Sequence, residues 1–233
     1  IDTPEDIGHA LNHCNIKEIN YLSYSHLDPD HTFGMRVIEQ LRLNWLDLSI
    51  NKKCDNPIKV LALPNVLNDV NALSTKYGSI FDYYESLNLI KRKSVNKKIV
   101  INDIKITFVP ANEEATVTIF IFEQNGKKLI YAPCDVKPFP NSRLFYDADY
   151  LIIGNTIIGN ILKNNFYLTK NNPLNLELFS FEEVLELKAK YNIQNVIITH
   201  LEEDWGKSYD DYLNYEKECI AVKFAYDGMT IEL

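Results

Sequence analysis

The first hundred residues alternate between two hydrophobic periods. Residues 6–14 carry apolar side chains three and four positions apart, the spacing of an amphipathic helix. Residues 19–25 are mostly apolar or aromatic and are typical of a β-strand, and a second helical period begins at Met35. The elements expected in this part are helices over 6–14, from Met35 and over 66–77, the last with Leu67, Val70, Leu73 and Tyr77 on one side, and strands over 19–25 and 59–63.

From residue 99 the pattern changes to period two, with β-branched and aromatic residues in short runs. Gln124-Asn125-Gly126 separates two of these runs and predicts a hairpin turn. The expected strands are 99–101, 104–109, 116–123, 128–131, 150–153 and 195–199, with a helix over 181–191. Helices and strands thus alternate at both ends around a β-rich centre, which predicts a layered α/β fold with a mixed sheet or two sheets.

Length and charge narrow the class of protein. A chain of 233 residues that is 46% hydrophobic can bury a sizeable core, and we expect one domain spanning 1–233. Lys and Arg number 24 against 32 Asp and Glu, and the net charge of -8 argues against an extended nucleic-acid partner. The basic cluster within 91–98 is short, and we expect a solvated turn before a strand there.

The cysteine pattern indicates a reducing compartment, and the apolar runs indicate no membrane span. The four cysteines are widely spaced and form no CxxC pair, so neither a zinc ribbon nor a disulfide scaffold is expected. No apolar run approaches the roughly 18 residues of a membrane span, and no signal-peptide pattern opens the sequence. We therefore expect a cytoplasmic protein that acts on a small molecule away from membranes, with homodimer formation left open.

The densest chemistry lies in a loop between the second strand and the following helix. His26-Leu27-Asp28-Pro29-Asp30-His31 offers two imidazoles and two carboxylates in six residues. Burying these groups without a cation would cost several kcal/mol per uncompensated charge, and a pair of divalent metal ions would remove that cost. The alternative is an exposed loop, in which Asp28 caps a turn, Asp30 caps the helix and the histidines are solvated.

Two later residues share this placement at strand ends. The strand 128–131 is followed by Ala132-Pro133-Cys134-Asp135, and the strand 195–199 runs directly into His200. Singly, Asp135 could cap a turn and His200 could be a satisfied core residue. Because loops at the carboxyl ends of strands carry the chemistry of α/β proteins, the common placement favours a shared site.

Together these motifs resemble the metallo-β-lactamase superfamily. His26-x-Asp28-x-Asp30-His31, followed by Gly34, is similar to its His-x-His-x-Asp-His-x-x-Gly signature, with Asp135 at the bridging carboxylate and His200 at the last histidine. Ile198-Thr199-His200, with Tyr226-Asp227-Gly228-Met229 near the end, resembles the cyclic-phosphate phosphodiesterase branch associated with carbon-phosphorus lyase, and more distantly RNase Z. The resemblance implies a four-layer αβ/βα sandwich. It also implies that residues 1–3 end a strand and that the first N-terminal strands are absent from this sequence.

Two departures from the signature affect the first metal position. Asp28 stands where the family has its second histidine, and Glu113 aligns with a histidine expected after Pro110. The ligands that the resemblance implies are His26, Asp28, Glu113 and Asp135 for one ion, and Asp30, His31, Asp135 and His200 for the other. The first position would then be rich in oxygen, which favours Mn²⁺ or Fe²⁺ over Zn²⁺. An empty or weak first position, with a single ion bound, is the alternative.

The resemblance implies a metal-dependent hydrolase, most simply a phosphodiesterase that uses a hydroxide bridging two divalent ions, Zn, Mn or Fe. Asp30, His31, Asp135 and His200 are the expected catalytic centre. Residues after the last two strands are candidates for binding substrate or supplying an acid: Asn155, Glu202, Glu203, Asp204, Trp205, Ser208 and Tyr209. The candidates after the strand 195–199 fit equally well with a charged helix start that has Ser208 as its N-cap.

Two other classes of function remain open. Flavodiiron proteins of the same superfamily have an acid where Asp28 lies and perform redox chemistry, but they keep the later histidine that this chain lacks, and no flavin domain follows. A non-catalytic relative, with a degenerate first metal position, is the other alternative.

Overall fold

The computed structural model describes residues 1–76 and 78–233, so Tyr77, expected at the end of a helix, lies outside the described residues. The chain divides into two compact units, the first formed by Ile1–Lys97 with Glu113–Thr118 and the second by Lys98–Asn112 with Ile119–Leu233. The expected single domain over 1–233 stays a prediction.

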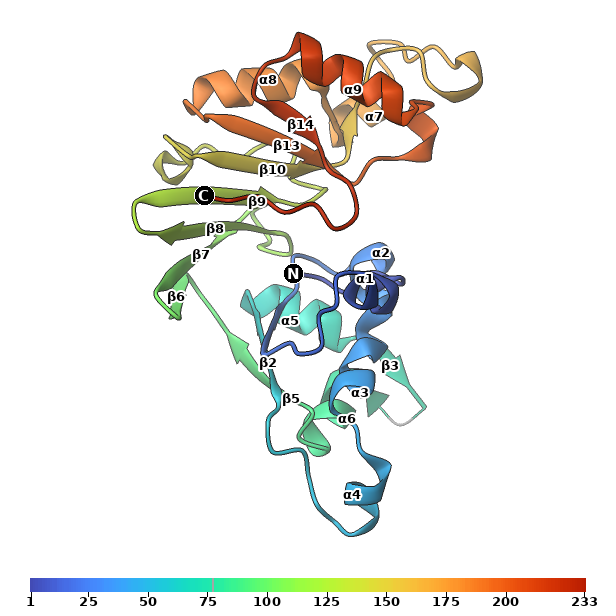
Figure 1. The fold of residues 1–233 in the computed structure, drawn as a ribbon, viewed down its shortest axis with the longest axis vertical. Helices are drawn as coiled ribbons and strands as arrows, with labels where there is room; N and C mark the ends of the chain where they lie inside the picture. Colours follow the sequence, from blue (N-terminus) through green and yellow to red (C-terminus); the bar gives the residue numbers. More distant parts are fainter. Residues whose placement is uncertain (77) are drawn as a thin grey trace. The chain divides into compact units, whose positions relative to one another are not determined.

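The first unit is built on three parallel strands in the order β1 (Tyr21–Ser23), β2 (Ile58–Ala62) and β5 (Ile90–Ser94) (Figure 1). The central strand is almost wholly buried, as expected of a parallel strand with both faces covered. Its helices are α1 (Ile7–His13), α2 (Pro29–Thr32), α3 (Val37–Arg42), α4 (Trp45–Ser49), α5 (Pro64–Asn71) and α6 (Ile80–Ser86), with a 3₁₀ turn, η1 (Phe33–Arg36), between α2 and α3.

Two predictions for this unit are wrong. The helix expected over 66–77 begins at Pro64 and ends at Asn71, and a small antiparallel pair, β3 (Ser74–Thr75) and β4 (Gly78–Ser79), follows it. The Asn71 side-chain oxygen accepts hydrogen bonds from Ser79 Oγ at 2.6 Å and from Arg92 Nη1 at 2.6 Å, which ties the helix end to the returning chain.

The basic segment at 91–94 is strand β5 and not a solvated turn. Arg92 pairs with Asp82 at 2.7 Å and with Glu85 at 2.5 Å, and both carboxylates belong to α6. This pairing lowers the pKa of Glu85. The acidic side of α6 thus compensates the charge that made a strand look improbable from the sequence.

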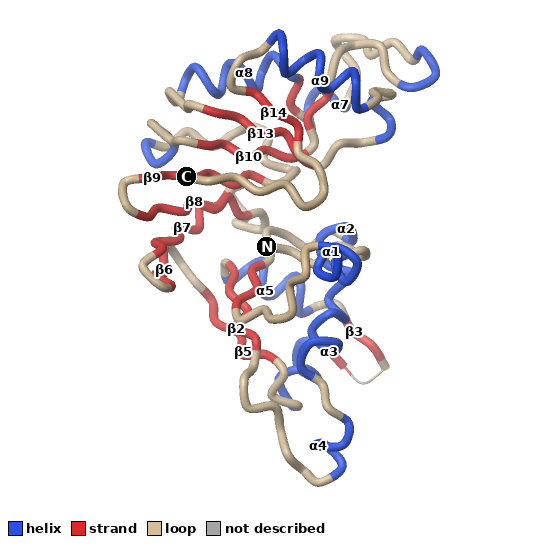
Figure 2. The backbone as a smooth tube through the Cα atoms, in the orientation of Figure 1, coloured by secondary structure: helices blue, strands red, loops and turns tan. Residues whose placement is uncertain are grey.

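The second unit is built on a seven-stranded mixed sheet in the order β14-β13-β10-β9-β8-β7-β6 (Figure 2). The strands are β6 (Lys98–Ile101), β7 (Ile104–Pro110), β8 (Thr118–Gln124), β9 (Lys127–Ala132), β10 (Tyr150–Gly154), β13 (Asn195–Thr199) and β14 (Val222–Phe224). β9, β10, β13 and β14 run parallel, whereas β8 and β9, and β6 and β7, are antiparallel. The six strands predicted from the period-two pattern and the buried runs are confirmed, with small shifts at their ends.

Local sequence explains several boundaries in this unit. Asn125 and Gly126 both have positive φ, 51° and 78°, as a two-residue hairpin turn requires. Helix α8 (Phe181–Lys190) begins with a capping box between Ser180 and Glu183. Its Phe181, together with Tyr212 and Tyr215 of α9 (Tyr209–Glu218), packs on Phe224 of β14, which fixes both helices against the sheet.

The remaining short elements connect these strands and helices. β11 (Thr156–Ile157) pairs in parallel with β12 (Phe179–Ser180). Along the chain, the 3₁₀ turn η3 (Lys163–Asn165) and α7 (Leu174–Glu177) lie between β11 and β12. The 3₁₀ turn η2 (Arg143–Phe145) precedes β10, and η4 (Glu203–Trp205) follows β13. None of the described helices has both the length and the apolar character needed to cross a membrane.

Candidate functional site

The His26–His31 loop of the first unit follows β1 and turns into α2. Pro29 at the first turn sets the helical start, and Thr32 Oγ1 donates to the carbonyls of Leu27 at 2.9 Å and Asp28 at 3.0 Å. Asp28 stands at the N-cap position, but its side chain accepts no capping hydrogen bond from the described helix. The loop is therefore held through its backbone carbonyls and the Thr32 hydroxyl, and the Asp28 carboxylate does not cap α2.

The two histidines of this loop lie close together, with ring centroids 4.1 Å apart and ring planes tilted by 49°. Both are buried, His26 to 3% exposure and His31 to 8%. His31 Nε2 lies 3.3 Å from Asp30 Oδ2, and His26 Nε2 lies 3.7 Å from Asp28 Oδ2. Each imidazole therefore directs Nε2 towards a carboxylate of the same loop, and both carboxylates are about half exposed.

Asp2 and Ser25 hold the opposite edges of both rings. The buried Asp2 carboxylate accepts from the Ser25 amide at 2.7 Å and from the Ser25 hydroxyl at 2.6 Å, and it lies 2.8 Å from His31 Nδ1. Ser25 Oγ in turn lies 2.8 Å from His26 Nδ1. Since the Ser25 hydroxyl donates its one proton to Asp2, it can only accept from His26, and both histidines then carry their proton on Nδ1.

This arrangement assigns Nε2 of both histidines as lone-pair donors. A carboxylate or hydroxyl behind Nδ1 that fixes ring and tautomer is the usual support of a metal-binding histidine. Two such nitrogens beside two carboxylates fit a divalent transition-metal ion. Burial lowers the pKa of His31, but the hydrogen bond and charge of Asp2, with the charges of Asp30 and Asp28, outweigh burial and leave that pKa raised.

The signature glycine is required by the segment that carries Asp2. Gly34 N donates to Thr3 O at 2.8 Å, and Thr3 N donates to His31 O at 2.8 Å. A Cβ on Gly34 would lie 1.8 Å from Pro4 O, a contact that no side-chain rotation can relieve. Residues 1–3 were expected to end a strand, but they form none in this structure, since their backbone instead binds the signature loop and Ser23.

In the second unit, the candidate residues follow three strands that pair in order. Asp135 comes three residues after β9, Asn155 follows β10 directly and His200 follows β13 directly. All three have left-handed backbone, with φ of 58°, 49° and 54°. Asn, Asp and His tolerate this region better than other non-glycine residues, and such conformations concentrate at functional sites.

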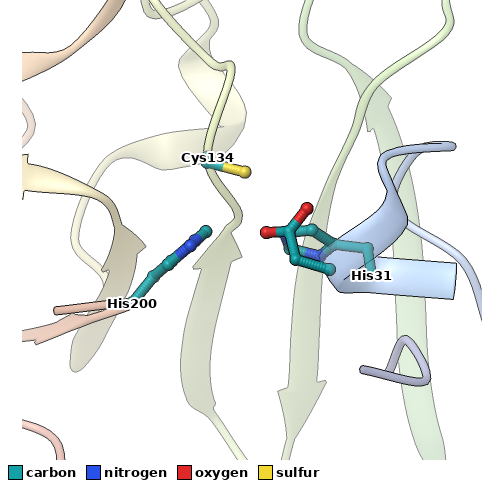
Figure 3. A group of neighbouring side chains, drawn as sticks. His31, Cys134 and His200 are labelled. Carbon is teal, nitrogen blue, oxygen red and sulfur yellow. The ribbon is translucent and has the colours of Figure 1, made fainter. Parts of the chain in front are cut away.

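Cys134 and His200 extend from these strand ends towards the same space (Figure 3). Cys134 is 6% exposed, and its Sγ lies within 4.8 Å of a ring nitrogen of His200 and within 4.8 Å of a carboxylate oxygen of Asp135. His200 Nε2 also lies 3.1 Å from Glu202 Oε1. The second unit therefore gathers a thiol, an imidazole and a carboxylate.

The remaining predicted residues have more ordinary surroundings. Glu113, in the first unit, is exposed, and its loop is tied to α5 by a hydrogen bond from Asn65 Nδ2 to Glu114 O at 2.6 Å. Glu203 pairs with Lys163, and Ser208 caps α9 in a capping box with Asp211. Their assignments as ligand or substrate contacts stay predictions.

Two buried polar atoms near the end of β10 and in η4 lack partners among the described residues. They are Asn155 Oδ1 and the indole nitrogen of Trp205, a side chain that is 3% exposed. Buried polar groups are normally hydrogen-bonded, so an unsatisfied oxygen at a strand end keeps Asn155 a candidate for binding substrate.

Asp2, Ser25 and Cys134 were not assigned a role from the sequence. Asp2 lies 29 positions from its partner His31 in the sequence, and the residues next to Asp2 give no sign of this contact. Ser25 directly precedes His26, and a hydroxyl beside a predicted ligand was the one local signal. Cys134 adjoins the predicted bridging acid Asp135, but it belongs to no CxxC pair, the pattern that would have indicated a metal ligand.

No protein-family model matches the sequence, and no curated protein matches it. Solved structures do match over the whole chain. Zn²⁺-bound PqqB from Methylobacterium extorquens is 18% identical with a TM-score of 0.69, covering 100% of this chain and 81% of that one. A diphosphatase of the PhnP family is 13% identical with a TM-score of 0.67, covering 100% and 78%.

The short form of human tRNase Z is 12% identical with a TM-score of 0.62, and the match covers 99% of this chain and 86% of that one. At these identities the likeness concerns the fold. The resemblance read from the signature loop, with relatives among the PhnP family and tRNase Z, is confirmed at that level: the chain has the metallo-β-lactamase fold.

Proposed function

We propose that this protein is a metal-dependent hydrolase that cleaves a small phosphodiester. The observation that carries this proposal is the Asp2–Ser25 network, which leaves Nε2 of His26 and of His31 as lone-pair donors beside two carboxylates. Without a bound cation, burying these imidazoles beside two carboxylates would cost desolvation free energy and would add little to the stability of the fold.

The proposed ligands are those that the resemblance implies. They are His26, Asp28, Glu113 and Asp135 for one divalent ion, and Asp30, His31, Asp135 and His200 for the other. Bound Zn²⁺, Mn²⁺ or Fe²⁺ would supply a water of lowered pKa and a positive charge for the phosphate oxygens. Asp2 and Ser25 would keep the histidine rings in place while charge changes beside them.

Two of the similar structures support a phosphate compound as substrate. A diphosphatase and a tRNase both act on phosphate groups, and both share the fold over nearly the whole of this chain. An isothiocyanate hydrolase also shares it, with a TM-score of 0.54, so the fold alone does not select the substrate.

A pocket of the first unit offers room for the organic part of such a substrate. It has a volume of about 680 Å³, and its lining includes Phe33 and Met35, which follow His31 closely in the sequence. Its lining is Phe33, Met35, Arg36, Glu39, Trp45, Thr75, Ile80, Tyr83 and Tyr84. Because the wall is mainly aromatic and apolar, we propose that it takes a planar or apolar substituent of the ester.

Hydrolysis of bis(p-nitrophenyl) phosphate tests the proposal. We expect the purified protein to release p-nitrophenol with added Mn²⁺, Fe²⁺ or Zn²⁺, and chelation to abolish the reaction. Asp30→Ala and His31→Ala should each remove activity, whereas His13→Ala, an exposed histidine at the end of α1, should keep it. Equal activity in Asp30→Ala, His31→Ala and the unaltered protein would refute the proposed site.

The Glu113 assignment has its own test. Glu113→Gln should lose one metal ion and keep the other, since Glu113 is proposed to serve the first position only. The neighbouring exposed Glu114→Gln is the matched control, and it should keep both ions. Retention of both ions in Glu113→Gln would show that another residue completes the first position.

A further inference from the structure

Cys134 is a buried thiol at the end of a strand, and the proposed function gives it no role. It follows β9 after Ala132 and Pro133 and is 6% exposed. Cys14 is exposed, Cys54 and Cys219 are intermediate in exposure, and no disulfide joins cysteines of the described chain. Buried cysteine is commonly a small apolar side chain, so the surroundings of Sγ decide its role.

Two candidate metal ligands of the same unit lie near Cys134 Sγ. Cys134 Sγ lies within 4.8 Å of a His200 ring nitrogen and within 4.8 Å of an Asp135 carboxylate oxygen. With Zn–S bonds of about 2.3 Å and Zn–N bonds of about 2.0 Å, neighbouring donors on one ion lie about 3.0–3.5 Å apart. Cys134 Sγ is the donor that lies within reach of both the His200 imidazole and the Asp135 carboxylate.

The backbone holds the thiol at this place. Asp135 has left-handed φ of 58°, which turns the chain immediately after Cys134. Gly154, at the end of β10, packs so closely that a Cβ there would lie 2.8 Å from Cys134 N and 3.0 Å from Pro133 C. The strand end of β10 therefore packs directly against the backbone that carries the thiol.

We propose that Cys134 binds the second metal ion as a thiolate, together with Asp135 and His200. This inference rests on the proposed function, because it adds a ligand to the same centre. The S–H proton passes to water as the sulfur–metal bond forms. A thiolate is a soft ligand, so it biases this position towards Zn²⁺, while the oxygen-rich first position favours Mn²⁺ or Fe²⁺.

Cobalt substitution tests the thiolate directly. A cysteine sulfur bound to Co²⁺ gives a charge-transfer absorption band in the near ultraviolet, whereas nitrogen and oxygen ligands give none there. We expect the band in the unaltered protein, its loss in Cys134→Ser and its persistence in Cys219→Ser, the matched control in the same unit. Circular dichroism of each variant checks that the fold is retained, and Cys134→Ala repeats the test with an apolar side chain.

Metal competition gives the second readout. Loss of an orienting partner of a ligand lowers metal affinity about 10–100-fold, and loss of a ligand should lower Zn²⁺ affinity at least as much. Mn²⁺ affinity should change little in Cys134→Ser.

The outcomes separate this inference from the proposed function. Stoichiometric Co²⁺ binding without the band, or a band that persists in Cys134→Ser, overturns the thiolate and leaves the hydrolase standing. Failure of the unaltered protein to bind Co²⁺, Zn²⁺ or Mn²⁺ overturns both.

Discussion

The two units hold their candidate donors by different means. In the first unit, hydrogen bonds hold the donors: Ser25 contacts His26 Nδ1, Asp2 contacts His31 Nδ1, and all four side chains are buried. In the second unit, the backbone does so: Asp135 and His200 sit in left-handed conformations at strand ends, and Gly154 presses on the chain before Asp135. Side-chain hydrogen bonds thus orient the first set, whereas backbone conformation adds to side-chain contacts such as His200–Glu202 in the second, so different substitutions should disturb the two sets.

The largest effect should come from Gly34→Ala. The new methyl group would meet Pro4 O at 1.8 Å, so the backbone that carries Asp2 must move. We expect a loss of about 3 kcal/mol in the free energy of unfolding, measured with urea, and a loss of bound metal. Gly8→Ala in α1 is the control: its methyl meets only the Gln40 side chain, at 3.4 Å, and it should stabilise by about 0.5–1 kcal/mol. Equal stability of the two variants would show that residues 2–4 do not depend on Gly34.

Gly154→Ala is the counterpart in the second unit. Its methyl group would lie 2.8 Å from Cys134 N, and we expect a destabilisation of about 2 kcal/mol by urea unfolding. Because the displaced segment carries Asp135, metal affinity should fall in the same variant. A destabilised variant with unchanged metal affinity would mean that the backbone at Cys134 does not position the donors.

Asp2→Asn sharpens the comparison without changing the shape of the side chain. The amide can still accept from Ser25, but it no longer offers a charge to His31 Nδ1. We expect metal affinity to fall about 10–100-fold, measured by chelator competition. Asp6→Asn, at an exposed position that makes no side-chain cap to α1, is the control and should bind metal normally. Unchanged affinity in Asp2→Asn would remove the orienting role of Asp2.

A pH-dependent effect should arise away from both sets of donors. Asp149 accepts from the Lys128 amide at 2.8 Å and pairs with Lys127 at 3.1 Å, and these contacts lower its pKa, the Lys128 amide most. Its contribution is therefore present above the carboxyl pKa of the unfolded chain, about 3.9, and is lost as pH falls through the lower folded-state pKa. Asp149→Asn should cost about 1 kcal/mol at pH 7 and progressively less below pH 4. A cost that does not change with pH would contradict the role of the charge.

The smallest effect should come from Phe33→Ala at the aromatic pocket. Phe33 is 56% exposed, so its loss should barely change stability. If the pocket binds the organic part of the substrate, KM for bis(p-nitrophenyl) phosphate should rise several-fold with little change in kcat and none in metal content. Phe166→Ala, at an exposed phenylalanine of the second unit, should leave KM unchanged. Equal KM values for both variants would exclude the pocket from substrate binding.

The sequence is most informative where the functional residues are contiguous. The His26–His31 loop could be recognised because its four donors lie within six residues between a strand and a helix. Asp2 could not be, since its importance depends on contacts with Ser25 and His31 that only the folded chain creates. The same limit explains β5, whose basic residues are compensated by acids of α6, and the early end of α5 at Asn71.

Metal analysis of protein purified without added metal tests the central claim most directly. We predict close to two transition-metal ions per chain in the unaltered protein, fewer in His31→Ala and in His200→Ala, and no loss in His13→Ala. A content near zero that Zn²⁺, Mn²⁺ and Fe²⁺ all fail to restore would contradict a metal centre, and with it the proposed hydrolase.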